Sequence, residues 1–228
     1  NQKGYKVLLV DNDKQGDCSR GLDRRSPESV GIDEIMTEED PDMEKLIQNT
    51  NYENLDIITA NLNLLKANLE ASMDLTRVQQ TRLKKAVERV KEDYDFCVID
   101  NAPDINISVI NALAAADDVL IPIEIDDNTM EGMGELLKQI DTIKRDWNPE
   151  MKNVKCFISR YNRYNEAHTA GAEIIREYYP TMHTVIRNSL AVAKSTYAKM
   201  PVVQYSKRSA AAEDYKKLVR EYLQMIGR

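Results

Sequence analysis

The chain has 228 residues, of which 42% are hydrophobic and 30% are charged, a mixture typical of a globular protein with one sizeable core. No apolar stretch is long enough to cross a bilayer and no secretory signal peptide is recognisable, so we expect a cytoplasmic protein that does not insert into membranes. Its three cysteines form no CxxC pair. We expect reduced thiols at Cys18, Cys97 and Cys156, the last two in strand cores.

The net charge of −7 is distributed unevenly along the chain. Residues 151–228 carry 14 Lys and Arg against six Asp and Glu, whereas residues 1–150 carry a net charge of −15. A basic C-terminal third suits salt-dependent contact with nucleic-acid phosphates, without reading of the base sequence. A solvated surface of ordinary lysines explains the same counts, so charge alone does not decide between the two.

Two apolar runs each end in an aspartate. Val7–Val10 leads into Asp11, and Phe96–Ile99 leads into Asp100. Each run is typical of a buried parallel strand that carries its acid to the carboxyl end of a sheet. Ligands of open α/β sheets bind at that edge, and carboxylates without a His or Cys cluster favour a hard cation such as Mg²⁺ together with phosphates.

The segments around these strands alternate between helical and extended patterns. Before the second acid-ended strand we expect a short helix at Ile32–Met36, a strand at Leu55–Thr59 and a helix from Leu75 to Val90. After it we expect further elements in this order: a strand at Val119–Ile123, a long amphipathic helix over Met130–Ile143, a strand at Val154–Ser159, a helix at Glu166–Tyr178, and short strands at His183–Arg187 and Pro201–Val203. This alternation predicts one doubly wound α/β domain over residues 1–228, with a mostly parallel sheet and helices on both faces.

Four segments resemble, in the right order, the motifs of the ParA/Soj partition ATPases, a deviant-Walker P-loop group that also contains MinD. Asp11–Gly16 is similar to the family's switch I motif, Asp-x-Asp-Pro-Gln-Gly, and Tyr94–Pro103 is similar to its Walker B strand and switch II. Residues 111–122 and 201–215 follow later parts of the pattern. The resemblance covers nearly the whole chain and implies a P-loop NTPase-like fold, although each switch lacks one of the family's prolines.

The phosphate-binding segment of that fold has no counterpart in the sequence. A P-loop needs Gly-rich backbone followed by Lys and Ser or Thr, and neither Gly-Lys-Ser nor Gly-Lys-Thr occurs. The family places this loop and the first strand of its sheet about one βα unit before switch I, whereas four residues precede Tyr5 here. Asn1–Gly4 resembles the opening of the deviant Walker A motif, but it equally fits the end of a helix with Gly4 as its C′ residue.

The resemblance implies ATP and Mg²⁺ as ligands and a role for each acid. Asp100 would hold Mg²⁺ through water, Asp11 would lie in the outer shell of the same ion, and Asp13 would orient or activate the attacking water. Because phosphoryl transfer relies on positioning and charge neutralisation, loss of Asp13 is expected to slow hydrolysis more than binding. Asp13 also fits a structural role, as the cap of a helix beginning near Gln15.

Other positions are implied to contact the nucleotide. Arg160 and Asn162, after one strand, and Tyr205 and Ser206, near the end of the chain, would flank adenine. Lys3 would be the signature lysine that reaches across an ATP-bound homodimer.

DNA is the second implied ligand. ParA-like dimers bind DNA without sequence preference on the nucleoid, and the candidates in the basic third are Arg187, Lys194, Lys199, Lys207 and Arg208. The implied partner protein is a ParB-like centromere-binding adaptor, and the implied process is segregation of plasmid, chromosome or mobile-element DNA.

Two alternative functions stay open. Since the P-loop is missing, the chain also fits a non-catalytic ParA-like module that binds DNA or a partner. A MinD-like membrane role would need a free amphipathic tail with a basic face, whereas the last predicted helix, with Lys216 and Lys217, directly follows a core segment.

Overall fold

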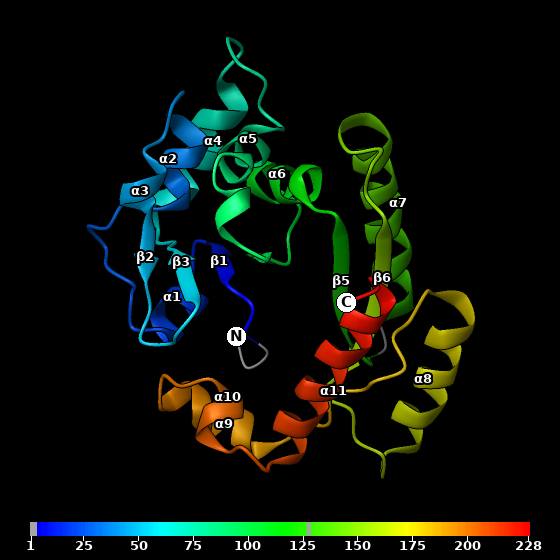
Figure 1. Ribbon diagram of the computed structural model, residues 1–228. Helices are drawn as coiled ribbons and strands as arrows, with labels where there is room; N and C mark the ends of the chain where they lie inside the picture. Colours follow the sequence, from blue (N-terminus) through cyan, green and yellow to red (C-terminus); the bar gives the residue numbers. More distant parts are fainter. Residues whose placement is uncertain (1–3, 127–128) are drawn as a thin grey trace. The chain divides into compact units, whose positions relative to one another are not determined.

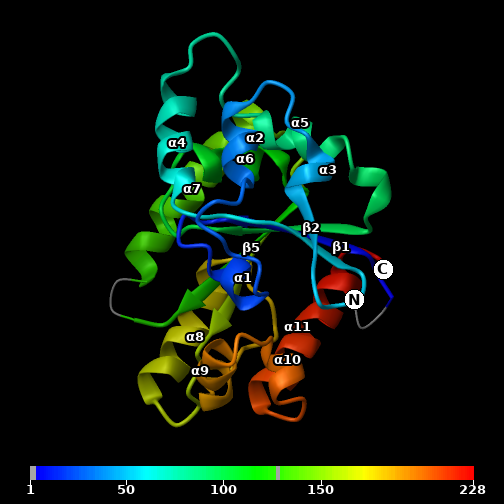
Figure 2. The same ribbon diagram turned by 90° about the vertical axis from the view of Figure 1, so that its left-hand side faces the viewer.

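The computed structural model describes residues 4–126 and 129–228, with the backbone alone for residues 129–131. The chain forms two compact units (Figures 1 and 2). Unit 1 comprises residues 1–116 and 143–149, and unit 2 comprises residues 117–142 and 150–228. The expectation of one domain over the whole chain stays a prediction.

Unit 1 is built on a four-stranded sheet with the strand order β2-β3-β1-β4. β1 (Val7–Asn12) pairs in parallel with β3 (Leu55–Ile58) on one side and with β4 (Phe96–Asn101) on the other, while β2 (Ile47–Asn49) runs antiparallel to β3. The apolar run of β1 suits this interior position, because a strand with two neighbours is covered on both faces. β4 is a margin strand, with no second neighbour among the described residues of this sheet.

Helices cover the sheet of unit 1 unequally. In both views one side carries most of them and α1 (Asp17–Gly21) lies on the other side (Figures 1 and 2). The crowded side holds α2 (Ile32–Thr37), α4 (Asn63–Met73), α5 (Arg82–Glu88) and α6 (Ile107–Ala115). Their buried side chains pack on Leu8 and Val10, alternate residues of β1, and so form the main core. α3 (Met43–Leu46) and a 3-10 turn at Lys91–Asp93 complete the unit.

Two predictions for unit 1 need correction. The helix expected from Leu75 to Val90 is only α5, because Asp74 accepts hydrogen bonds from the backbone and hydroxyl of Thr76 and holds a turn there. Cys97, expected in a strand core, is exposed because β4 lies at the sheet margin. The expected strand at Leu55–Thr59 and the helix at Ile32–Met36 are confirmed as β3 and α2.

Unit 2 contains a parallel pair of strands and the C-terminal helices. β5 (Asp118–Glu124) pairs with β6 (Asn153–Ser159) along their full length. The helices of the unit are α8 (Glu166–Tyr178), α9 (Leu190–Tyr197), α10 (Val202–Tyr205) and α11 (Ala210–Met225), together with most of α7 (Thr129–Trp147). These elements confirm the predicted strands at Val119–Ile123 and Val154–Ser159, the helix at Glu166–Tyr178 and the long helix.

A small core joins α11 to the strands of unit 2. Buried Met182, Ile186 and Leu218 pack against Leu120 of β5 and Phe157 of β6. The apolar face of the last helix is therefore used inside the unit.

The two short strands predicted near the end of the chain are wrong. His183–Arg187 forms no ladder and makes one isolated bridge, between Tyr161 and Arg187. Pro201–Val203 leads into the helix α10, with Pro201 at its N-cap. Proline has a fixed φ that suits a helix start, and this outweighs the strand preference of the two valines.

At the start of α2 the backbone of Gly31 passes so close to Thr59 that only glycine fits, and this can be tested by substitution. A Cβ atom on Gly31 would lie 2.0 Å from the carbonyl oxygen of Thr59, which itself accepts a hydrogen bond from the Ile32 amide. We expect Gly31→Ala to lower the free energy of unfolding by about 1–3 kcal/mol, measured by urea denaturation. Gly21→Ala, with no atom within 4 Å of its added carbon, is the matched control and should change stability by less than about 0.5 kcal/mol. Equal stabilities for the two variants would contradict this close approach.

Candidate functional site

The acids that end β1 and β4 lie side by side at the carboxyl edge of the unit 1 sheet. Asp11 and Asp100 are Cα partners in the parallel β1–β4 ladder. Partners in a parallel ladder project to the same face, and both carboxylates accept hydrogen bonds from residues of α1, so both lie on the side of that helix. Asp11 is fully buried, whereas Asp100 is exposed.

The first turn of α1 holds Asp11 in place. The Oδ2 atom of Asp11 accepts hydrogen bonds from the Ser19 amide at 2.7 Å and from the Ser19 hydroxyl at 2.6 Å. The same hydroxyl oxygen accepts a hydrogen bond of 3.0 Å from the Ala60 amide. One serine thus connects the ends of β1 and of the β3 segment to α1.

The ionised form of the Asp11 carboxyl is disfavoured in this position. Burial raises the pKa of its carboxyl above the usual value, hydrogen bonds from Ser19 and the Asp13 amide partly oppose this, and the nearby charge of Asp100 raises it further. A cation placed beside the two carboxylates would offset both the cost of burying the Asp11 charge and the repulsion between Asp11 and Asp100.

A neutral thiol contacts the second acid. Cys18 donates a hydrogen bond from its Sγ atom to Oδ2 of Asp100 at 3.1 Å. Burial, the charge of Asp100 and this hydrogen bond hold the pKa of the Cys18 thiol well above its usual range. The thiol therefore stays protonated and serves as a donor to the carboxylate.

Asp13 lies in the turn between β1 and α1. Its Oδ1 atom accepts a hydrogen bond of 2.9 Å from the Gln15 amide, and its carbonyl oxygen accepts one from Gly16 at 2.8 Å. Gly16 has a φ of 62°, and a Cβ atom there would lie 2.5 Å from the Ala60 carbonyl oxygen. The carboxylate shapes the turn but does not cap α1, which begins at Asp17.

An amide pair links the two predicted switch segments on the opposite face. Asn12 donates from Nδ2 to Oδ1 of Asn101 at 2.7 Å and to the Ser108 carbonyl at 3.0 Å. The buried Oδ1 atom of Asn12 has no hydrogen-bond partner among the described residues. It is an acceptor that a water or a further N–H donor would satisfy.

The carboxylates of Asp11 and Asp100 fit a magnesium ion that keeps several of its water ligands. They do not fit a site in which protein side chains alone surround the metal. No group of three His, Cys, Asp or Glu side chains within residues 4–126 and 129–228 could hold a metal by itself. Mg²⁺ commonly keeps several waters and takes one or two carboxylates plus substrate phosphates. Two adjacent carboxylates, one exposed and one buried, meet that requirement.

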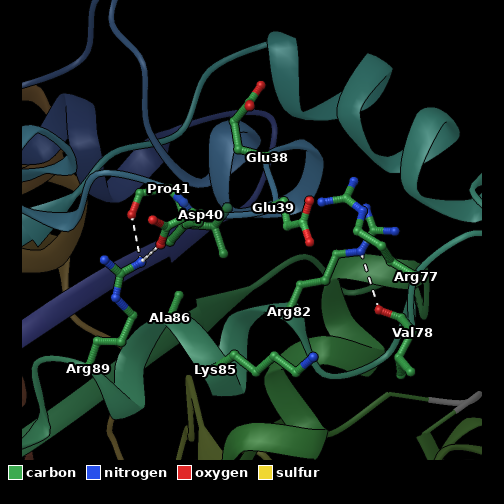
Figure 3. Close-up of a pocket in the computed structure, with 11 residues that line it drawn as sticks. Glu38, Glu39, Asp40, Pro41, Arg77, Val78, Arg82, Lys85, Ala86 and Arg89 are labelled. Atoms are coloured by element: carbon green, nitrogen blue, oxygen red, sulfur yellow. Dashed lines mark hydrogen bonds and ion pairs between the residues drawn. The ribbon is translucent and has the colours of Figure 1, made fainter.

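A cavity of about 250 Å³ lies elsewhere in unit 1, between the end of α2 and α5 (Figure 3). Most of its arginines are already paired. Arg82 bonds Asp74 at 2.7 Å, and Arg89 reaches Asp40 at 2.7 Å, as Figure 3 shows for Arg89. With its arginines paired and a volume below the usual 300–1,000 Å³ of ligand sites, this cavity is not a candidate ligand site.

The residues implied to flank adenine lie in unit 2. Arg160 has a φ of 52° and donates to Glu124 at 3.1 Å, and the amide of Asn162 bonds the His168 ring at 3.2 Å. Tyr205 ends α10, and Ser206 follows it. These side chains and the three aspartates belong to different units, so their joint role stays a prediction, and Lys3 lies outside the described residues.

Four of the five DNA-binding candidates are exposed on neighbouring helices of unit 2. α10 packs against both α9 and α11, and the four cations lie on or beside these elements: Lys194, Lys199, Lys207 and Arg208. Arg187 differs, because its guanidinium makes two hydrogen bonds of 2.7 Å to the buried carboxylate of Asp214. Burial alone would raise the pKa of Asp214, but the Arg187 hydrogen bonds and charge outweigh it and lower that pKa.

Comparison with known proteins decides the family. A family model described as AAA domain matches residues 1–153. The sporulation initiation inhibitor protein Soj of Bacillus subtilis is 30% identical over 222 residues, covering 96% of this chain and 86% of Soj. The chain belongs to the ParA/Soj family. The chromosome partitioning protein ParA of Caulobacter vibrioides is 28% identical over 225 residues, covering 96% of this chain and 83% of that protein.

Solved structures confirm the P-loop NTPase-like fold for this member of the ParA/Soj family. A plasmid partition protein of Borrelia burgdorferi bound to AMPPNP superposes with a TM-score of 0.81 at 22% identity, over 98% of this chain and 88% of that one. Cobyrinic acid a,c-diamide synthase of Mycobacterium smegmatis, with an ATP analogue and magnesium, gives 0.76 at 23% identity, over 87% and 80% of the two chains. No helix in the described part of this chain is long and apolar enough to cross a membrane.

The sequence did not reveal every residue of the site. Cys18 and Ser19 follow the family-like motif in an unremarkable polar run, and no spacing rule shows that they bond the two strand-end acids. Asn12 and Asn101 occupy variable positions of the two motifs, so their hydrogen bond also needed the structure.

The buried state of Asp11 can be tested by pH. A folded-state pKa above the ordinary value of 3.8 means that wild-type stability falls as pH rises through the window between the two values. Asp11→Asn keeps an acceptor for Ser19 and removes the charge. We therefore expect the stability of this variant relative to wild type to increase from pH 4 towards pH 7, measured by urea denaturation at each pH.

The control is Asp17→Asn, which removes an exposed acid from α1, the helix that carries Ser19. Its difference from wild type should not grow over this range. A pH-independent difference for Asp11→Asn would contradict the burial of an ionisable carboxyl.

Proposed function

We propose that this ParA-like protein is a Mg²⁺-dependent ATPase that segregates DNA, and that Asp11, Asp13 and Asp100 form its hydrolytic centre. The observation that carries the proposal is the register of β1 with β4, which places Asp11 beside Asp100 at the ligand-binding edge of the sheet. Relatives of this fold have been solved with AMPPNP or with an ATP analogue and magnesium, which supports nucleotide as the ligand.

Each acid has a separate task. Asp11 and Asp100 would hold a hydrated Mg²⁺, which would supply neutralisation of the charge on the phosphates. Asp100, exposed at the strand end, would accept hydrogen bonds from water bound to the ion. The buried Asp11 would add a second negative charge near the same ion. Asp13, two residues beyond Asp11 in a turn, would orient the attacking water and accept its proton.

Hydrolysis can be separated from binding at Asp13. We expect Asp13→Ala to lower kcat by about a hundredfold or more while KM for ATP changes by less than about threefold. Asp100→Asn should instead weaken Mg²⁺-dependent ATP binding, measured by calorimetry with and without the metal. Asp17→Asn, an exposed acid at the start of α1 that pairs with Arg20, is the matched control.

Two outcomes bear on competing ideas. Wild-type kcat in Asp13→Ala would contradict the role of that residue. If the protein binds no Mg²⁺-ATP, the second candidate function follows, a non-catalytic module for DNA or a partner.

The basic helices of unit 2 are proposed to bind DNA through phosphates. Lys194 and Lys199 at α9, with Lys207 and Arg208 before α11, present cations from adjoining elements, which suits contact with phosphates. In the proposed cycle an ATP-bound homodimer binds nonspecific DNA on the nucleoid, and a ParB-like centromere-binding adaptor stimulates its release. A membrane role is disfavoured, because α11 buries Leu218 and Leu223 in the unit core.

Salt dependence tests the DNA surface. Replacing Lys194, Lys199, Lys207 or Arg208 by Ala should weaken binding to any duplex sequence and reduce the slope of log K against log salt by about one each. The control Lys138→Ala, on α7, should leave the slope unchanged. Arg187→Ala should mainly destabilise the fold, by about 2 kcal/mol, because it leaves Asp214 buried without its cation. Salt-independent binding would contradict the electrostatic account.

A further inference from the structure

α4 carries apolar side chains on two opposite sides. Its inner side packs into the unit 1 core through Leu64, Ala67 and Ala71. A second set of large apolar residues, spaced by three, four and four positions, is between 61% and 71% exposed. This outer stripe consists of Leu62, Leu65, Leu69 and Met73. Such spacing keeps all four side chains along one line of the helix.

The outer stripe is unusual for a surface. Single exposed leucines are common, but contiguous apolar surface of this kind on a small protein marks an interaction site. Figure 2 shows α4 at the margin of the helical layer of unit 1, next to α2, which leaves this side of the helix open within that unit. Leu75 and Val78, in the loop after α4, are also exposed, by 92% and 50%.

The charges beside the stripe indicate what covers it. On one flank Lys66 and Glu70 follow Leu65 and Leu69 by one residue each and form an exposed ion pair of 3.2 Å. The other flank presents the uncharged Asn68 and Ser72. When two identical helices pair antiparallel about a two-fold axis, the same flank of each meets the other in reverse order.

This geometry matches the sequence of α4. The stripe is centred between Leu65 and Leu69, and the charged pair is centred within about one residue, or about 1.5 Å, of the same point. An antiparallel pair therefore brings Lys66 opposite Glu70 of the partner subunit, twice by symmetry. A parallel two-fold pair would instead place the charged flank of each helix against the uncharged flank of its partner.

We propose that two copies of this chain associate through α4, antiparallel and two-fold, with the outer stripe as the buried centre and reciprocal Lys66–Glu70 pairs at its rim. This association requires no nucleotide. It is therefore independent of the ATP-bound homodimer in the proposed function and can fail or succeed separately from it.

Sedimentation equilibrium without nucleotide tests the proposal. Wild type should show a reversible monomer–dimer equilibrium. The double variant Leu65→Gln, Leu69→Gln should raise the dimer dissociation constant by about a hundredfold or more, because both changes remove the centre of the interface. These positions are more than half exposed, so the thermal midpoint should be retained. Leu190→Gln, at a residue 79% exposed on α9, is the matched control and should leave the dimer intact.

A charge exchange tests the orientation. Lys66→Glu and Glu70→Lys should each weaken the dimer by about tenfold, and the two together should restore it to within about twofold of wild type. A wild-type chain that stays monomeric at about 100 μM, including one whose stripe is covered by another protein, overturns the proposal. So does a dimer that the Leu65 and Leu69 changes leave intact, or a double charge variant no better than either single one.

Discussion

The in-register parallel pairing of β1 with β4 is the constraint on which the site depends. Side chains of a strand alternate between faces, so a slip of one residue would turn Asp100 to the opposite side of the sheet from Asp11. The ladder of paired residues from Val7 with Phe96 to Asn12 with Asn101 holds the register, and the two acids come together because both runs end at the same level. Helix α1 then closes the site, with Ser19 on one acid and Cys18 on the other.

The buried Asp11 and its hydrogen bonds do not give the greatest stability that this part of the fold could have. Burying Asp11 without a cation opposes folding, and only the hydrogen bonds of Ser19 and the Asp13 amide offset that cost. A neutral residue would suit the same space better. Sites where sequence and packing disagree in this way are the places where proteins keep groups needed for chemistry.

Much of the fold could be predicted from the sequence, because short apolar runs bounded by polar residues define β1, β4, β5 and β6. The motif resemblance singled out three aspartates, and the structure places two of them, Asp11 and Asp100, side by side. The loop before α5 was missed because periodicity does not register the turn that Asp74 makes with Thr76. The roles of Cys18 and Ser19 depend on the angle at which α1 leaves the strand, which no spacing encodes. Cys97 was misplaced because the margin position of β4 follows from the whole sheet and not from its own residues.

The residues of unit 2 illustrate a different limit. Arg187 and Lys194 look alike as cations in a basic segment, yet the buried carboxylate of Asp214 engages only the first. Composition counts charges without showing which of them are already neutralised. A basic segment attracts polyanions only through the cations that no carboxylate of the protein already neutralises.

Gly16 connects the turn after β1 to α1, and so links the position of that helix to the binding of a cation at Asp11. Its left-handed backbone is the joint between the strand-end turn and α1, and α1 supplies the Ser19 donors to Asp11. Any tilt of α1 about this joint would admit water to Asp11, and any cation drawn to Asp11 would in turn change how firmly α1 is docked. By thermodynamic linkage, a cation bound at the strand edge and the docked position of α1 affect each other's free energy by the same amount.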